Sequence, residues 1–141
     1  MVKIGKEYRW EMSHRLPFHK GGCYNIHGHS YKMMVELTGV PDANGMLLDY
    51  YVIDNIVKPL LNEYDHALIL DKNDKKSIRL IEELQFKYKV IETTSTSENL
   101  SLHFLNILEK EFYEFENIFG ITVRVYETED AFAEISKNIR Q

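Results

Sequence analysis

Apolar and polar residues alternate along two stretches near the start of the chain. From residue 2 to residue 14, one face of the alternation carries Tyr8, Trp10, Met12 and His14. After a loop from Pro17 to Ile26, the same alternation runs from His27 to Leu37. A period of two is typical of a half-buried β-strand. We therefore predict two strands joined by a long loop.

Two further stretches have the period of a helix. Asp49 can cap a helix from Tyr50 to Glu63, in which Pro59 should produce a kink or a late break. The residues Ser95 to Glu98 have the S-x-x-E form of a capping box. They predict the start of a second helix, whose inward stripe is Leu100, Phe104, Ile107, Leu108 and Phe112.

The remaining segments give weaker patterns. We predict a solvated loop at 71–76, a short helix at 77–84, a short strand at 86–93, and strands at 121–128 and 131–136 joined by a turn at 129–130. With the stronger elements, they indicate an α+β protein in which residues 1–141 form one domain.

Composition narrows the classes of function. Hydrophobic residues make up 44% and charged residues 28%, which is typical of a soluble globular protein. The net charge of -5 offers no broad cationic surface, so we expect neither nucleic acid nor membrane as a partner. The N-terminal segment lacks the apolar stretch of a signal peptide, and we expect a cytoplasmic location.

Three histidines have the spacing of a metal site. His27 and His29 share one face of their strand, about 6.5 to 7 Å apart at Cα. If the first two strands pair as a hairpin, His14 lies beside them. Three imidazoles leave zinc one open position, which is the arrangement of catalytic sites. The alternative is that the H-x-H pair is a coincidence, and the third histidine in register argues against it.

Cys23 and an Asp-His pair are candidates for acid-base chemistry. Cys23 precedes His27 by four residues, so it is either a fourth metal ligand or a base beside the metal, and the spacing leaves both open. Asp65 can orient the imidazole of His66, although adjacent pairs of this kind are common by chance.

Glu127 falls on the buried face of its predicted strand, in register with Ile121, Val123 and Val125. A buried carboxylate needs a partner. It either pairs with a cation of the protein or receives hydrogen-bond donors from a ligand.

The order of these motifs resembles the 6-pyruvoyl-tetrahydropterin synthase family, which includes the 6-carboxy-tetrahydropterin synthases. The resemblance rests on five segments spread over nearly the whole chain: His14-Arg15-Leu16, Cys23-x-x-x-His27-Gly28-His29, Asp65-His66, Thr96-Ser97-Glu98-Asn99 and Tyr126-Glu127-Thr128. It departs from the family at Ser95, where a proline is frequent.

This resemblance implies a tunnelling fold, in which a four-stranded antiparallel sheet carries two main helices on one face. Sheets from several subunits would join into a barrel. The family's usual assembly is a hexamer of two stacked trimers, with active sites where subunits meet. We expect such a homo-oligomer here.

The resemblance also assigns roles to residues. It makes His14, His27 and His29 the ligands of one Zn²⁺ per chain and Cys23 the proton acceptor. Asp65 and His66 would form the relay that activates the thiol, Glu127 would anchor the pterin ring, and Thr96 and Glu98 would line the pocket.

The implied reaction is zinc-dependent and begins from 7,8-dihydroneopterin triphosphate. We expect 6-carboxy-5,6,7,8-tetrahydropterin with release of acetaldehyde and triphosphate, on the route to queuosine and other 7-deazaguanine bases. The alternatives are 6-pyruvoyl-tetrahydropterin, the product of the tetrahydrobiopterin branch, an aldolase-like cleavage that gives 6-hydroxymethyl-dihydropterin, and a non-catalytic protein that binds zinc or pterin.

Overall fold

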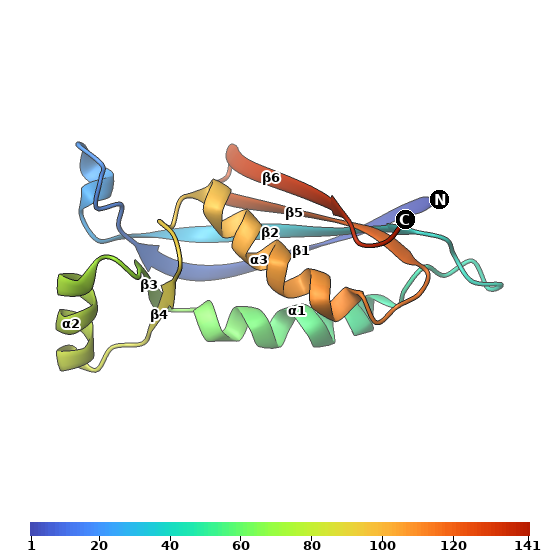
Figure 1. The fold of residues 1–141 in the computed structure, drawn as a ribbon, viewed down its shortest axis with the longest axis horizontal. Coiled ribbons are helices and arrows are strands. Elements are labelled where there is room, and N and C mark those ends of the chain that lie inside the picture. The colour runs from blue at the N-terminus through green and yellow to red at the C-terminus, as the bar shows by residue number, and fades with distance from the viewer.

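The computed structural model describes residues 1–141 as a curved sheet with its helices beside it (Figure 1). Four strands form the antiparallel body of the sheet: β1 (Val2–His14), β2 (His27–Gly39), β5 (Ile118–Thr128) and β6 (Ala131–Asn138). All four were predicted, with small differences at their ends. The hairpin register is also as predicted, because His14 of β1 lies directly opposite His27 of β2.

The sheet has six strands in the order β4-β3-β1-β2-β5-β6, so the prediction of a four-stranded antiparallel sheet is wrong. The two additional strands, β3 (Ala67–Asp71) and β4 (Tyr88–Ile91), run parallel to β1 and to each other. The helix between them, α2 (Lys75–Leu84), begins inside the segment predicted as a loop. β3 was missed because it is a short, continuously apolar run without alternation.

The two longer helices are α1 (Tyr50–Tyr64) and α3 (Ser97–Phe112), and a short 3₁₀ helix (Gly22–Tyr24) lies in the loop after β1. Asp49 caps α1 by accepting a hydrogen bond from Tyr51 N, as predicted. Pro59 lies inside α1. The capping box was placed one residue too early, because α3 is capped by Thr96, whose Oγ1 accepts from Asn99 N.

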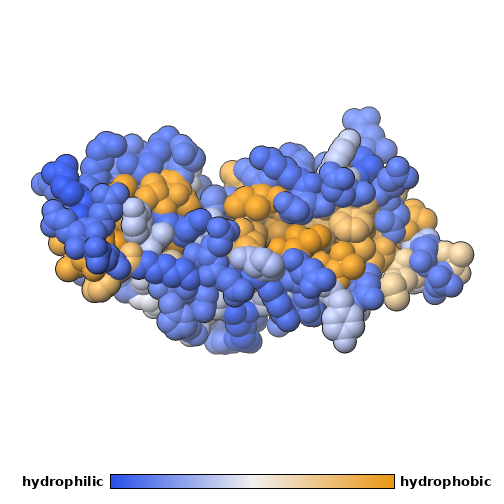
Figure 2. All heavy atoms as spheres, turned by 90° about the horizontal axis from the view of Figure 1, so that it is seen from below, coloured by the Kyte–Doolittle hydropathy of each residue, from blue (hydrophilic) through white to orange (hydrophobic).

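The core lies between the sheet and α1 and α3, which cover one face of it (Figure 1). Trp10 of β1 and Tyr31 of β2 stack at its centre, and Trp10 also makes a T-shaped contact with Phe104 of α3. Figure 2 looks onto the side of α1 and shows apolar patches with hydrophilic borders. No helix of the chain has the length and apolar character needed to cross a membrane.

Candidate metal centre and its surroundings

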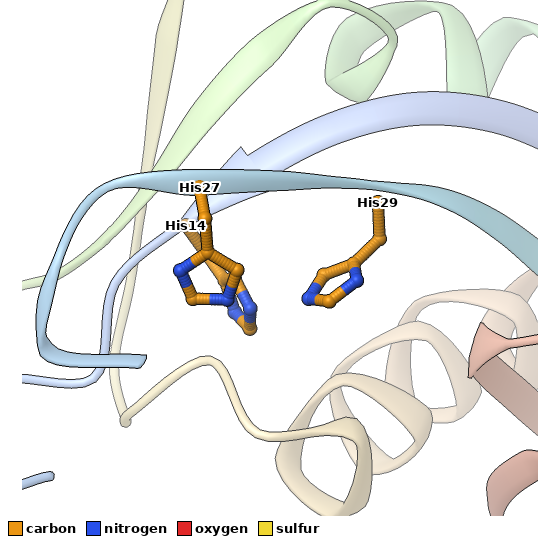
Figure 3. A group of neighbouring side chains, drawn as sticks. All are labelled: His14, His27 and His29. Atoms are coloured by element: carbon orange, nitrogen blue, oxygen red, sulfur yellow. The ribbon is translucent and has the colours of Figure 1, made fainter. Parts of the chain in front are cut away.

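The three histidines converge on the face of the sheet that is covered by α3 (Figure 3). His27 and His29 project from the same side of β2, and His14 reaches them from the end of β1. The ring centroids of His14 lie 4.6 Å from His27 and 5.2 Å from His29, and those of His27 and His29 are 4.9 Å apart. One ring nitrogen from each histidine falls within 4.8 Å of the others.

Hydrogen bonds orient two of these rings. His14 Nδ1 lies 2.8 Å from the carbonyl oxygen of Ser95 and 3.1 Å from its hydroxyl, and His27 Nδ1 lies 2.7 Å from the carbonyl oxygen of Asn25. A carbonyl only accepts, so in each ring Nδ1 carries the proton and Nε2 keeps a free lone pair. Both Nε2 atoms are buried and have no hydrogen-bond partner.

The electrostatic environment favours the neutral forms of His14 and His29. Burial is the main cause that lowers the pKa of His14 to about 4; the hydrogen bond to Ser95 opposes it, and the neighbouring His27 and His29 add to it. Burial and the charge of His27 also lower the pKa of His29. Neutral imidazoles with unpartnered lone pairs aimed at one point fit a divalent transition metal such as zinc, so the donor set suits the predicted ion.

Cys23 lies in the loop that precedes β2. It is half-buried, its side chain makes no hydrogen bond, and its sulfur does not belong to the converging ligand atoms. Its carbonyl oxygen accepts a hydrogen bond from Leu16 N at 2.8 Å, which closes the loop. A charge on Cys23 contributes, after burial and Glu127, to a raised pKa of Tyr31. The thiol therefore belongs to the same neighbourhood as the histidines, although it is not placed as a fourth ligand.

Glu127 points from β5 into this neighbourhood. Its only ionic partner is His14, with 3.8 Å between Oε1 and Nε2, so no lysine or arginine of the chain pairs with it. Burial raises its pKa, the charge of Glu98 raises it further, and His27 opposes the effect. The sequence left open whether Glu127 pairs with a cation of the protein or with a ligand. Within the chain, the only candidate cation is His14, at 3.8 Å.

The two residues predicted to line the pocket lie at the start of α3. The hydroxyl of Thr96 is used to cap the helix, and Glu98 is in its first turn. The charge of Glu98 acts on Glu127, which brings Glu98 to the edge of the site. The first turn of α3 therefore faces the strand that carries Glu127.

Asp65 and His66 lie on the opposite face of the sheet. Asp65 Oδ2 is 3.0 Å from His66 Nδ1, and Asp65 Oδ1 accepts a hydrogen bond from Glu11 N, so the pair is well oriented. The imidazole is exposed and lines an open cavity of about 380 Å³ together with the outward-facing Ser13 and Ser30, and His29 also borders this cavity. Within one chain, the Asp-His pair does not join the three histidines.

Sequence reasoning missed two residues of the site. Ser95 orients His14 through both its carbonyl oxygen and its hydroxyl, and only its position directly before the helix cap could have indicated this. Tyr31 follows His29 by two residues and shares its face of β2. The alternation of side chains along a strand could therefore have indicated that Tyr31 belongs to the site.

Comparison with known proteins identifies the family to which the chain belongs. Residues 3–138 match the family model described as 6-pyruvoyl tetrahydropterin synthase. The chain belongs to this family. It is 32% identical to the 6-carboxy-5,6,7,8-tetrahydropterin synthase of Haemophilus influenzae over 142 aligned residues, which cover 95% of this chain and 98% of the relative.

Other relatives give a consistent picture. A putative 6-carboxy-5,6,7,8-tetrahydropterin synthase of Archaeoglobus fulgidus is 30% identical, with 95% of each chain covered. The crystal structure of 6-pyruvoyl tetrahydropterin synthase from Plasmodium vivax superposes with a TM-score of 0.78 at 20% identity, covering 97% of this chain and 98% of the other. The structure of 6-pyruvoyl tetrahydropterin synthase from Caenorhabditis elegans superposes with a TM-score of 0.70 at 21% identity, covering 97% of this chain and 96% of the other. These structures share the α+β fold.

Proposed function

We propose that this protein is a zinc-dependent lyase that converts 7,8-dihydroneopterin triphosphate to 6-carboxy-5,6,7,8-tetrahydropterin, with release of acetaldehyde and triphosphate. The observation that carries the proposal is the pair of buried, unpartnered Nε2 atoms of His14 and His27, which converge with a ring nitrogen of His29. The names of the relatives that are about 30% identical favour the carboxy product.

His14, His27 and His29 would hold the zinc. When bound, the metal supplies Lewis-acid stabilisation of negative charge that develops on an oxygen of the substrate. Ser95 and Asn25 fix the tautomers of two of the ligands, so their lone pairs are available without a change of protonation.

The chain's own side chains supply the remaining chemistry. In the proposal, the thiolate of Cys23 removes a proton from the side-chain carbon of the substrate, since it lies free of the ligand set. Glu127 has no lysine or arginine partner, and its two carboxylate oxygens can accept paired N–H donors from the aminopyrimidine edge of a pterin. Glu98 and Thr96 border the same space and would shape the pocket.

The position of Asp65 and His66 supports an oligomeric site. Their pair faces away from the three histidines of its own chain, yet its exposed imidazole is oriented by a carboxylate as a proton relay requires. We propose that a second copy of the chain presents its Asp65-His66 pair to Cys23, in a hexamer built of two trimers. Such an assembly would also cover the open edge strands β4 and β6.

Product analysis tests the proposed reaction. Zinc-loaded protein is incubated with dihydroneopterin triphosphate, and pterins, triphosphate and acetaldehyde are measured against a metal-free control. The proposal expects 6-carboxy-tetrahydropterin with acetaldehyde and triphosphate in equal amounts. The pyruvoyl product would assign the tetrahydrobiopterin branch instead, 6-hydroxymethyl-dihydropterin would indicate the aldolase-like reaction, and no turnover would indicate a binding protein.

A mixing experiment tests the shared site. Cys23→Ala and His66→Ala chains are each expected to be inactive alone. When the two are unfolded together and refolded as mixed oligomers, some interfaces combine an intact Cys23 with an intact His66 of another chain. Activity should then return, and a mixture that stays inactive would contradict a site built from two subunits.

A further inference from the structure

Only four buried polar side-chain atoms in the chain lack a hydrogen-bond partner, and three of them lie in one cluster of rings. They are His14 Nε2, His27 Nε2 and the hydroxyl of Tyr31, while the fourth, Arg140 Nε, belongs to the C-terminal segment. Unpartnered buried groups are rare in folded proteins because they cost free energy. A metal accounts for the two imidazole nitrogens, but a hydrogen-bond donor such as a hydroxyl needs an acceptor.

The ring of Tyr31 is held firmly in this cluster. It is fully buried, lies opposite Trp10 in the β1–β2 register, and stacks on it with 5.3 Å between centroids and 20° between planes. It also meets His14 and His29 nearly at right angles, at 6.0 and 5.4 Å. Packing therefore explains the ring of Tyr31 and leaves its hydroxyl unexplained.

Tyr31 is a neighbour both of the three histidines and of Glu127. On β2 it follows the metal-facing His29 on the same face of the sheet. The pairing of β2 with β5 ends at Lys32 and Tyr126, and Glu127 follows Tyr126 at an irregularity of β5. The charge of Glu127 adds to burial in raising the pKa of Tyr31, which places the carboxylate near the phenol. A ligand that spans Glu127 and the three histidines would therefore lie beside Tyr31.

We infer that the hydroxyl of Tyr31 donates a hydrogen bond to an oxygen of the ligand bound beside the three histidines. This inference rests on the proposed function and adds a donor to it. A phenol is protonated at neutral pH, so the group acts as a donor. A fixed donor of this kind stabilises negative charge that develops on the side-chain oxygen of the substrate. Tyr31 is thus a ligand-contacting residue of the reaction.

The substitution Tyr31→Phe isolates the hydroxyl because it keeps the ring and its stacking on Trp10. Tyr8→Phe is the matched control, since Tyr8 is also a buried tyrosine of the sheet but its hydroxyl already donates to Asp54 at 2.8 Å. Both variants are compared with the wild type in zinc content, in the stability of the metal-free protein to urea, in affinity for 7,8-dihydroneopterin, and in kcat and KM.

Tyr31→Phe should keep about one zinc per chain and leave the urea midpoint of the metal-free protein unchanged or raised, because an unpartnered polar group is removed. Its affinity for dihydroneopterin should fall about tenfold, and kcat should fall about 100-fold. Tyr8→Phe should lower the urea midpoint and leave ligand affinity unchanged.

Two results would overturn the inference. A lower urea midpoint for metal-free Tyr31→Phe would mean that the hydroxyl has a structural partner, and unchanged affinity and kcat would mean that it does not touch the ligand. The stability measurement needs neither zinc nor pterin. If the wild type fails to bind dihydroneopterin or turn over, the proposed function fails, and the urea midpoints still decide whether the hydroxyl is a structural group.

Discussion

Acidification should destabilise the metal-free protein through His14. The side chain is only 1% exposed, and its pKa falls from an ordinary 6.5 to about 4 in the folded chain. The His14 side chain therefore binds a proton more readily in the unfolded chain than in the folded chain. The stabilisation from His14 is complete above pH 6.5 and is lost as the pH falls through this window toward 4. A difference of about 2.5 pH units corresponds to about 3 kcal/mol, at about 1.36 kcal/mol per unit.

His14→Asn is the appropriate control variant. The asparagine amide can still donate a hydrogen bond to the carbonyl oxygen of Ser95, but it does not titrate. The carboxylates and histidines distant from His14 are unchanged, so their contributions cancel when the two proteins are compared. The coupling of His14 with the neighbouring His27 and His29 is part of the measured difference.

The assay is urea unfolding in the presence of a chelator, at several pH values from 8 to 4 and at one protein concentration. The free energy of unfolding of the wild type should fall by about 3 kcal/mol more than that of His14→Asn over this range. Parallel curves for the two proteins would show that His14 is not held neutral by burial, and this part of the account would then be wrong.

Three other predictions follow from single residues. Cys23→Ala should lower kcat by at least 10²-fold while zinc content, measured by atomic absorption, stays near one per chain; loss of the metal would make Cys23 a ligand. Glu127→Gln should weaken pterin binding about 10- to 100-fold in calorimetry with zinc retained, and unchanged affinity would remove Glu127 from the pocket. Gly39→Ala should destabilise the protein by about 1–3 kcal/mol in urea unfolding, because its Cβ would lie 2.0 Å from Asn117 O; Gly22→Ala has free space and should be neutral.

The sequence contained enough to place the three histidines together. Period two fixed the face of His27 and His29, and hairpin pairing brought His14 opposite His27. The same rule placed Glu127 on the inner face of its strand. Local patterns succeed here because strand geometry determines which side chains share a face.

Other features depend on tertiary structure and could not be read from a local pattern. The strand Ala67–Asp71 is buried and does not alternate, so its sequence does not distinguish it from a buried helical turn. The carbonyl oxygen of Ser95 accepts a hydrogen bond from His14, although the two residues are 81 positions apart in the sequence. The face on which Asp65 and His66 lie depends on how the parallel strand β3 joins β1, and the structure places the pair beside the outward-facing Glu11, away from the inward-facing histidines.

The central claim is that zinc is bound by His14, His27 and His29 with Cys23 outside its ligand set. X-ray absorption at the zinc edge of the loaded protein measures this directly. The account predicts a first shell of nitrogen and oxygen at about 2.0–2.1 Å with the outer-shell scattering of three imidazoles. A sulfur neighbour at about 2.3 Å, or fewer than three imidazoles, would contradict it.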